Sequence, residues 1–185
     1  MIAMASQSRT LVGDRQDPLR VRYQTEPGPA QITDRARAVR GAELDPFHGR
    51  VVAGTRGGES VLSIGAHAAV GGYHDDPNPG DMLCAALAAC FDSTLRMIAN
   101  RLGVRLTRLD VEVAADVDVR GALMVDRDVP VGFSAMRCTV DLATAEGTPA
   151  NLTEAMVASA ENCCIVMNTL RAGVPVTTEA HFTDQ

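Results

Sequence analysis

The chain has 185 residues, of which 46% are hydrophobic and 22% charged, with a formal net charge of −6. This composition is typical of one globular domain with a core large enough to support itself. The negative charge and the low aromatic content of 3% argue against a nucleic-acid partner. The first ten residues lack the apolar run of a signal peptide, so we expect a cytoplasmic protein whose five cysteines are free thiols.

The N-terminal part of the chain predicts short strands. Residues 1–17 are polar and unpatterned, and we expect them to be a loose segment ahead of a single domain over residues 18–185. The alternation from Leu19 to Tyr23 predicts a strand, and residues 32–39 predict a polar, exposed one. A hairpin is expected from residues 50–53 and 60–64, joined by a glycine-rich turn that carries Arg56.

The stretch from Asn78 to Gly103 predicts one long helix. Asn78 suits the N-cap, Pro79 the first helical position, and Asp81 places a negative charge at the positive helix end. Residues 82–91 are almost all apolar or small, which is typical of a helix buried on every side. The charged residues that follow make the apolar run too short to span a bilayer, so we expect no membrane partner.

The remaining chain predicts two strands, then helices, then a closing strand. Residues 109–119 and 133–142 alternate cleanly, each with one apolar and one polar face. A short helix is expected from Pro149 to Ala160, a second from Asn162 to Arg171, and a strand over residues 174–182. This order favours an α+β fold over a doubly wound parallel sheet.

The cysteines Cys90 and Cys164 are the residues most suited to chemistry. Cys90 lies twelve residues beyond Asn78, roughly 18 Å along the axis, so the dipole of its own helix does not activate it. A reactive Cys90 therefore needs a cation from elsewhere, and an arginine is the expected one. If Asn162 caps a new helix, Cys164 falls in its first turn, where free N–H groups stabilise a thiolate. If the helix instead runs on unbroken from Pro149, that argument fails.

Two plainer interpretations compete with a reactive thiol. Free cysteine is among the most buried residue types, so Cys90 is also compatible with a structural role in the core. Metal ligation by Cys90 and the Cys163–Cys164 pair with a histidine is a minor alternative, because adjacent cysteines on a helix do not both face one ion. The histidines themselves read as surface or turn residues, among them His48, His67 and His74.

Two separated motifs resemble the OsmC/Ohr family, which comprises osmotically inducible protein C and the organic hydroperoxide resistance proteins. The first is Asn78-Pro79 followed by the Ala- and Leu-rich run that ends at Cys90. The second is Cys164-Ile165-Val166 with Leu170 and Gly173-Val174-Pro175-Val176, in which Ile165 stands where the family usually has proline. The resemblance covers about residues 45–182.

This resemblance implies a fold and a chemistry. Family members are intertwined homodimers in which two long central helices are wrapped by antiparallel sheets. By resemblance, Cys90 would be the peroxidatic thiol of an organic hydroperoxide reductase, and Cys164 would resolve its sulfenic acid as a disulfide. An external dithiol would then reduce the disulfide, and no bound cofactor is expected. In the family an arginine stabilises the thiolate and a glutamate orients that arginine.

The chain departs from the family pattern at the activating pair. The family glutamate directly follows Asn-Pro, where this chain has Gly80; Asp81 is one position late and therefore turned by about 100°. Arg56, on the glycine-rich turn, is the first choice for the arginine, while Arg35, Arg37 and Arg50 stay open. Gly80 favours an alternative in which the protein has no catalytic activity and binds a small apolar ligand at the dimer interface. Cys163 has no family role.

Overall fold

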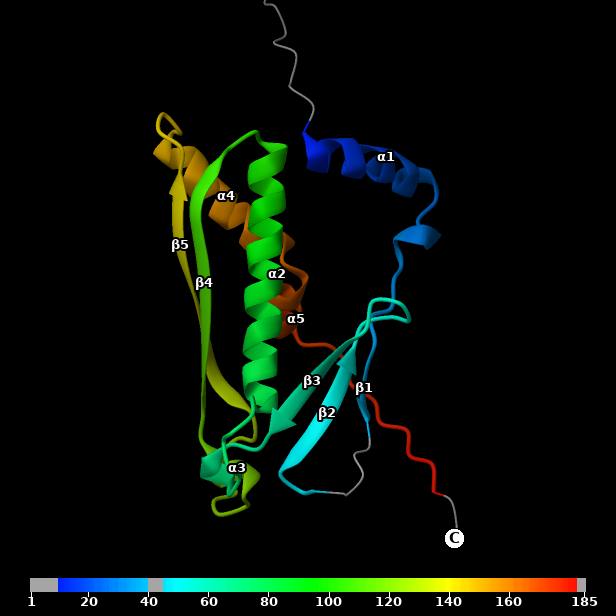
Figure 1. Cartoon of the computed structure of the whole chain (residues 1–185), viewed down its shortest axis with the longest axis vertical. Helices are drawn as coiled ribbons and strands as arrows, with labels where there is room; N and C mark the ends of the chain where they lie inside the picture. The colour runs from blue at the N-terminus through cyan, green and yellow to red at the C-terminus, as the bar shows by residue number, and fades with distance from the viewer. Residues whose placement is uncertain (1–9, 40–44, 183–185) are drawn as a thin grey trace, which may run out of the picture.

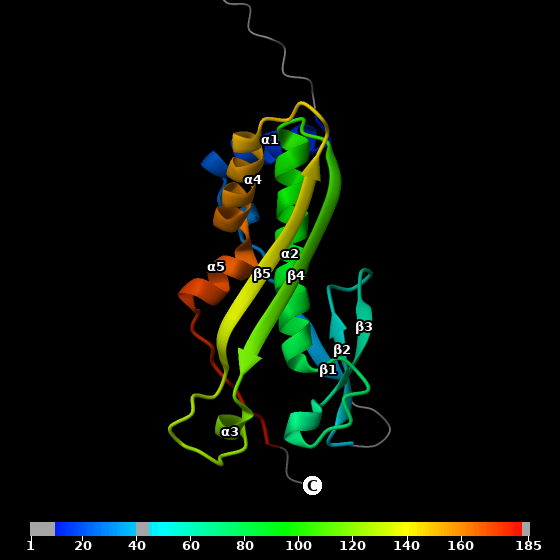
Figure 2. The same ribbon diagram turned by 90° about the vertical axis from the view of Figure 1, so that its left-hand side faces the viewer.

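The computed structural model describes residues 10–39 and 45–182, and its elements divide into two antiparallel sheets and a set of helices (Figures 1 and 2). The first sheet has the order β1-β2-β3, with β1 over Ala36–Val39, β2 over His48–Ala53 and β3 over Ser60–Gly65. The second pairs β4, Leu106–Val117, with β5, Phe133–Thr144. The helices are α1 Leu11–Thr25, α2 Pro79–Arg101, α3 Val119–Ala122, α4 Ala150–Cys163 and α5 Ile165–Ala172, with 3-10 turns at Gly28–Ala30 and Ala68–Val70.

Helix α2 begins as the sequence predicts. Asn78 accepts hydrogen bonds from the backbone N–H groups of Gly80 and Asp81, at 2.8 and 3.3 Å, and Asp81 Oδ2 accepts from the backbone N of Asn78 at 2.9 Å. This reciprocal capping box satisfies donors that the first turn leaves free. The helix ends at Arg101, before Gly103, whose φ of +70° suits glycine.

The core lies between α2, the β4–β5 hairpin and the two C-terminal helices. Leu87, Phe91, Leu95 and Ala99 are spaced four residues apart, so they share one face of α2 and are all buried. They pack with Met156 of α4 and with other buried residues of α4 and α5: Ala160, Cys164 and Met167. The predicted apolar faces of the two long strands point into this core, which confirms both strands (Val111, Val113, Met136, Cys138, Val140, Leu142).

The opposite face of α2 is uncovered in its first half. Ala85, Ala86 and Ala89 are exposed there, so the expectation that the helix is buried on every side is wrong for one chain by itself. Length and apolar composition would allow α2 to cross a membrane. Its other face instead packs into the core of the α+β domain, against β4, α4 and α5 (Figure 2).

The strand predicted over Leu19–Tyr23 is wrong, because these residues belong to α1. Part of the segment expected to be loose, residues 11–17, forms the start of this helix. Thr10 caps it by accepting a hydrogen bond from the backbone N of Gly13 at 3.1 Å. The helix lies beside the end of α2 (Figure 1), and an ion pair between Asp17 and Arg101, at 2.5 Å, joins the two helices. Five alternating residues are compatible with helix or strand, and the cap and this tertiary contact favour helix.

The strand predicted over residues 174–182 is also wrong for the described chain. Residues 174–182 have no strand pairing, and Val176 and Phe182 are 87% and 92% exposed. An extended segment becomes a strand only when another strand supplies its hydrogen bonds. The hairpin of β2 and β3 is confirmed, with the turn at residues 54–59, and so is the exposed strand β1 within residues 32–39.

Candidate functional site

The structure brings Cys90 and Cys164 together where α5 packs on α2. Cys90 is half-buried on α2, and Cys164 is fully buried at the junction of α4 and α5. Each thiol shifts the pKa of the other, so the two side chains lie close together, and neither cysteine is in a disulfide. They come from elements 74 residues apart in the chain, so only the packing of α5 on α2 places them in contact.

The junction at Cys164 differs from both alternatives considered for it. Asn162 does not cap a new helix, and the helix does not run on unbroken. Helix α4 extends through Cys163, and Cys164 itself is the N-cap of α5, its Sγ accepting a hydrogen bond from the backbone N of Met167 at 3.5 Å. The cap position gives Cys164 an extended backbone, with φ −70° and ψ 109°, which turns α5 away from the axis of α4.

Asn168 supports this break, and the sequence analysis did not single it out. Its Nδ2 donates to the carbonyl oxygens of Glu161 and Cys164, at 2.9 and 2.8 Å. The last carbonyls of a helix have no partner within that helix, so a side-chain amide that reaches back over them stabilises the end of α4. An asparagine one turn after a cysteine pair is the only sequence signal for it.

The start of α5 points its free N–H groups at Cys90. Burial acts to raise the pKa of Cys90, but hydrogen bonds from the backbone N–H of Val166, the Cys164 thiol, the backbone N–H of Ile165 and the Thr94 hydroxyl outweigh it. The pKa of Cys90 therefore lies below its ordinary value of 9.0. Helix N-termini are known to stabilise thiolates in this way. The activation expected for Cys164 thus acts on Cys90, across the space between two helices.

Cys164 shifts in the opposite direction. Burial raises its pKa, and so do its hydrogen bond with Cys90 and the negative charge of the Cys90 thiolate, against the N–H groups of Met167 and Val166. The pair is therefore asymmetric: the pKa of Cys90 is lowered and that of Cys164 is raised, so Cys90 is the more acidic of the two thiols.

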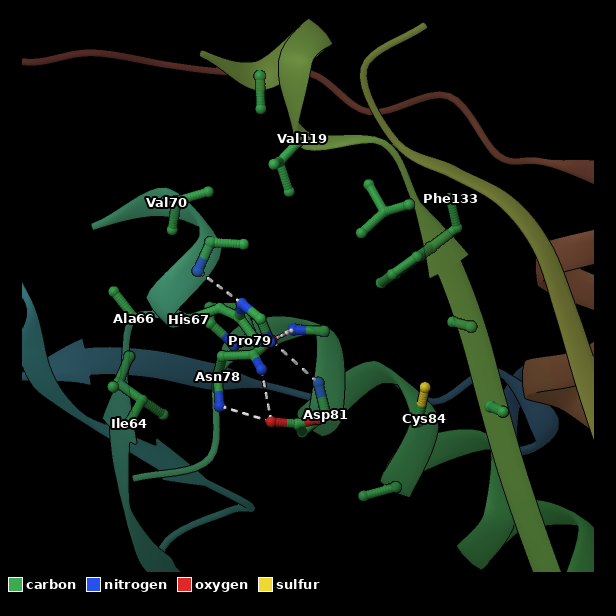
Figure 3. Close-up of a pocket in the computed structure, with 18 of the residues that line it drawn as sticks. Ile64, Ala66, His67, Val70, Asn78, Pro79, Asp81, Cys84, Val119 and Phe133 are labelled. Atoms are coloured by element: carbon green, nitrogen blue, oxygen red, sulfur yellow. Dashed lines mark hydrogen bonds between the residues drawn. The ribbon is translucent and has the colours of Figure 1, made fainter. Parts of the chain in front are cut away.

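The two further residues predicted for the site lie elsewhere. Arg56 is exposed on the turn between β2 and β3, and within the described residues of this chain no arginine is among the groups that shift the pKa of Cys90. Asp81 is engaged in the capping box of α2, where its Oδ2 also accepts from Asn78 Nδ2 at 2.6 Å (Figure 3).

Gly80 is closely packed in the first turn of α2. A Cβ atom on Gly80 would lie 2.9 Å from Asn78 Oδ1 and 3.0 Å from Cζ of Phe133. Phe133, at the start of β5, therefore packs closely against position 80. A larger residue at this position would require the side chains of Asn78 and Phe133 to shift.

A cavity of about 1380 Å³ lies beside the first half of α2 (Figure 3). Its walls are the start of β2, the end of β3 and the turn that follows it to Val70, the start of α2, the second half of β4 and Phe133. The lining is mainly apolar and includes Cys84, but among the described residues that line it neither Cys90 nor Cys164 is found. Burial and the charge of Asp81 raise the pKa of Cys84.

The sequence did not predict a cluster of His48 with two aspartates and a tyrosine at the edge of this cavity. His48, at the start of β2, places Nδ1 2.7 Å from Asp45 Oδ2 and Nε2 3.0 Å from Asp75 Oδ1, and its ring stacks on Tyr73 with centroids 5.5 Å apart. Hydrogen bonds to these carboxylates raise the pKa of His48. The backbone N–H of Phe47, followed by the His48 ring, lowers the pKa of Asp45, and the His48 ring lowers that of Asp75. The His–Asp spacing in the sequence does not predict this cluster, because Asp75 is 27 residues away.

Comparisons with known proteins agree with this fold. The family model described as OsmC-like protein matches residues 72–179, more than half of the chain, so the chain belongs to the OsmC family. No curated protein matches the sequence.

Solved structures show the same architecture. An OsmC-like protein from Mycoplasma pneumoniae is 14% identical with a TM-score of 0.60, covering 77% of this chain and 90% of that one. An organic hydroperoxide resistance protein OsmC from Legionella pneumophila is 26% identical with a TM-score of 0.50, covering 76% and 90%. One from Elizabethkingia anophelis is 18% identical with a TM-score of 0.55, covering 77% and 91%. The α+β OsmC fold is thereby confirmed.

Proposed function

We propose that this protein is a thiol-dependent peroxidase that reduces organic hydroperoxides through Cys90 and Cys164. The observation that carries the proposal is the contact between the two thiols at the start of α5, where the pKa of one is lowered and that of the other raised. The structural relatives from Legionella pneumophila and Elizabethkingia anophelis are organic hydroperoxide resistance proteins, which supports the same class of substrate.

The reaction follows from this asymmetry. The Cys90 thiolate attacks the distal oxygen of the hydroperoxide, the O–O bond breaks, and the alkoxide leaves as the alcohol after taking a proton. Cys90 is then a sulfenic acid. Cys164 attacks its sulfur, a disulfide forms, and the hydroxyl leaves as water. An external dithiol reduces the disulfide by exchange, so that each turnover consumes one hydroperoxide and one dithiol.

The opposite pKa shifts of the two thiols set the order of these steps. While Cys90 is a thiolate, its charge keeps the neighbouring Cys164 protonated and unreactive. Oxidation of Cys90 removes that charge. Of the effects that raise the pKa of Cys164, burial then remains. The resolving thiol becomes a better nucleophile at the moment when its target has formed.

We also propose that the protein functions as a homodimer. Two features support a second copy: the uncovered apolar face of α2 at Ala85, Ala86 and Ala89, and the unpaired extended segment over residues 174–182. A second copy could cover the first and pair with the second. It could also carry the activating arginine, and the exposed Arg56 is the residue we propose for that role. Light scattering on the purified chain tests the dimer, and a monomeric mass would contradict it.

The reducing cytoplasm is the compartment that fits this reaction, because it keeps thiols reduced and supplies dithiols. The decisive experiment treats reduced protein with one equivalent of cumene hydroperoxide, beside an untreated control, and measures intact mass and peptide linkage. We expect a rapid loss of two hydrogen atoms that maps to a Cys90–Cys164 disulfide. An unchanged mass would overturn the peroxidase proposal.

A second function is favoured by a separate observation. The apolar cavity beside Cys84 stands apart from the thiol pair, and Phe133 packs closely against the position where the family carries its glutamate. A protein without peroxidase activity that binds a small apolar ligand there would leave Cys90 unoxidised in the same experiment. Quenching or enhancement of an apolar fluorescent probe, lost in Ala88→Phe, would then support ligand binding.

A further inference from the structure

A compact loop over residues 66–76 connects β3 to α2 and forms one wall of the cavity. Its ends lie close together, because the backbone N–H of Gly65 donates to the carbonyl oxygen of Pro77 at 3.0 Å, as in an Ω-loop. Ala66 and Val70 of this loop line the cavity (Figure 3). The width of the cavity therefore depends on how firmly the 66–76 loop is held.

One histidine joins the 66–76 loop to the start of β2. His48 also lines the cavity; its Nε2 lies 3.0 Å from Asp75 Oδ1, and its ring stacks on Tyr73 with centroids 5.5 Å apart. Phe47 adds an edge-on contact with Tyr73, with centroids 5.6 Å apart. Within the part of the chain that the structure describes, the other hydrogen bonds of the loop lie within residues 65–77. Polar and aromatic contacts from His48 and Phe47 thus fasten the loop to β2.

The hydrogen bonds of His48 require a proton on both ring nitrogens. Nδ1 lies 2.7 Å from Asp45 Oδ2, so each nitrogen faces a carboxylate. An ionised carboxylate only accepts, and a neutral imidazole carries one N–H, so only the imidazolium donates to both aspartates. In the neutral ring one nitrogen lone pair would face a carboxylate oxygen. Asp45 is the nearer partner and is fixed by the backbone N–H of Phe47 at 2.7 Å, so the contact with Asp75 is the one that the neutral ring loses.

We propose that His48 is a pH-dependent latch for the cavity: its imidazolium holds the 66–76 loop against β2, and loss of its proton releases Asp75 and opens the cavity. The groups that face the ring are Asp45, ahead of β2, and Asp75 and Tyr73 of the loop; among the described residues no further charged group shifts the pKa of His48. The inference concerns the cavity and not the thiol pair, so it does not depend on the peroxidase proposal.

Two further observations support the latch. Hydrogen bonds to Asp45 and then to Asp75 raise the pKa of His48 above its ordinary value of 6.5, so the latch is closed below 6.5 and opens as the pH rises through the folded value. Within the loop, His74 lies in the left-handed region with φ +57°, a conformation that a residue other than glycine keeps only when its surroundings hold it.

Cys84 lines the cavity and serves as the reporter (Figure 3). The rates at which bulky, apolar pyrenyl iodoacetamide and small iodoacetamide alkylate Cys84 are measured separately from pH 5.5 to pH 9 and resolved by peptide mass. Both reagents attack the thiolate, so the ratio of the two rates cancels its ionisation and reports access. In the wild type we expect this ratio to rise roughly threefold as His48 loses its proton, the scale of a partly exposed ion pair. At the exposed Cys163 the ratio should not change with pH.

Variants separate a latch from a structural contact. Asp75→Asn removes a charge that keeps the proton on His48, so the rise in the ratio should move to lower pH. His48→Gln has no group that titrates in this range, and its ratio should be high at every pH. His181→Gln is the control and should keep the wild-type profile, because His181 is 83% exposed and lies outside the cluster.

A wild-type ratio that does not change with pH overturns the inference, and so does a rise that persists unchanged in His48→Gln. If His48→Gln does not fold, a rise in Asp75→Asn at the wild-type pH overturns it in the same way. Failure of the peroxidase proposal looks different: Cys90 would stay unoxidised by cumene hydroperoxide, while access to Cys84 would still follow His48.

Discussion

Cys84 and Cys90 lie on the same helix, six residues apart and both half-buried, yet their pKa values move in opposite directions. Cys84 faces the cavity, where burial and the charge of Asp81 raise its pKa. Cys90 faces α5, whose first N–H groups outweigh the same effect of burial. The difference follows from what each thiol faces: the N–H groups of another helix lower the pKa of Cys90, whereas Cys84 meets only burial and the negative charge of Asp81 on its own helix.

The strongest test of this comparison exchanges each thiol for a hydroxyl. Cys90→Ser should abolish peroxide turnover, because a serine hydroxyl is not ionised at neutral pH, while the near-isosteric change should cost little stability. Cys84→Ser is the matched control and should keep wild-type turnover. The assay follows loss of cumene hydroperoxide with a dithiol reductant present. Activity in Cys90→Ser, or its loss in Cys84→Ser, would exchange the roles of the two cysteines.

Removal of the resolving thiol should limit the protein to one turnover. In Cys164→Ser the sulfenic acid of Cys90 has no partner, so one equivalent of peroxide should be consumed and the oxidised sulfur should persist. Mass spectrometry after dimedone labelling detects it. Cys163→Ser is the control, because Cys163 is exposed and is not among the described residues that shift the pKa of Cys90. A sulfenic acid resolved equally fast in Cys164→Ser would show that another thiol completes the reaction.

A smaller effect is expected from Asn168, which stabilises the end of α4 that turns α5 toward Cys90. Asn168→Ala leaves the carbonyls of Glu161 and Cys164 without this donor, so the junction should loosen and the Cys90 thiolate should be less well held. We expect alkylation of Cys90 to slow by about threefold to tenfold, with that of Cys84 unchanged. Equal slowing at both thiols would indicate general destabilisation instead.

The smallest effect concerns the far wall of the cavity, where His48 joins Asp45 and Asp75. The raised pKa of His48 gives stability that is present below its ordinary value of 6.5 and is lost as the pH rises through its folded value. The lowered pKa values of Asp45 and Asp75 give stability that is present above 3.8 and is lost as the pH falls. The cluster should therefore stabilise the fold most between these limits.

His48→Gln tests this window, with thermal unfolding measured from pH 4 to pH 9. The wild type should lose its advantage over the variant as the pH rises through the folded pKa of His48, which lies above 6.5. His181→Gln is the control, because His181 is 83% exposed and lies outside the cluster. A difference between wild type and His48→Gln that does not change with pH would mean that the ring acts only by stacking on Tyr73.

The long elements could be predicted because each carries its signal locally. Asn78 and Pro79 define the start of α2, and the alternation in β4 and β5 defines their inner faces. The short elements could not be predicted in this way. The alternation of Leu19 and Val21 is compatible with a helix as well as a strand. Helix α1 is stabilised by its cap at Thr10 and by the ion pair between Arg101 and Asp17. Residues 174–182 alternate as a strand does, but they form one only if the edge strand of a sheet pairs with them.

The candidate site divides in the same way. Cys90 and Cys164 could be named from their motifs, and the sequence by itself determined that a thiol on α2 would need outside help, since the dipole of its own helix is too distant. The source of that help was decided by the tertiary structure. Hydrogen bonds are directional and act over about 3 Å, so only the break at Cys164, held by Asn168, and the packing of α5 on α2 bring the N–H groups of Ile165 and Val166 to the sulfur.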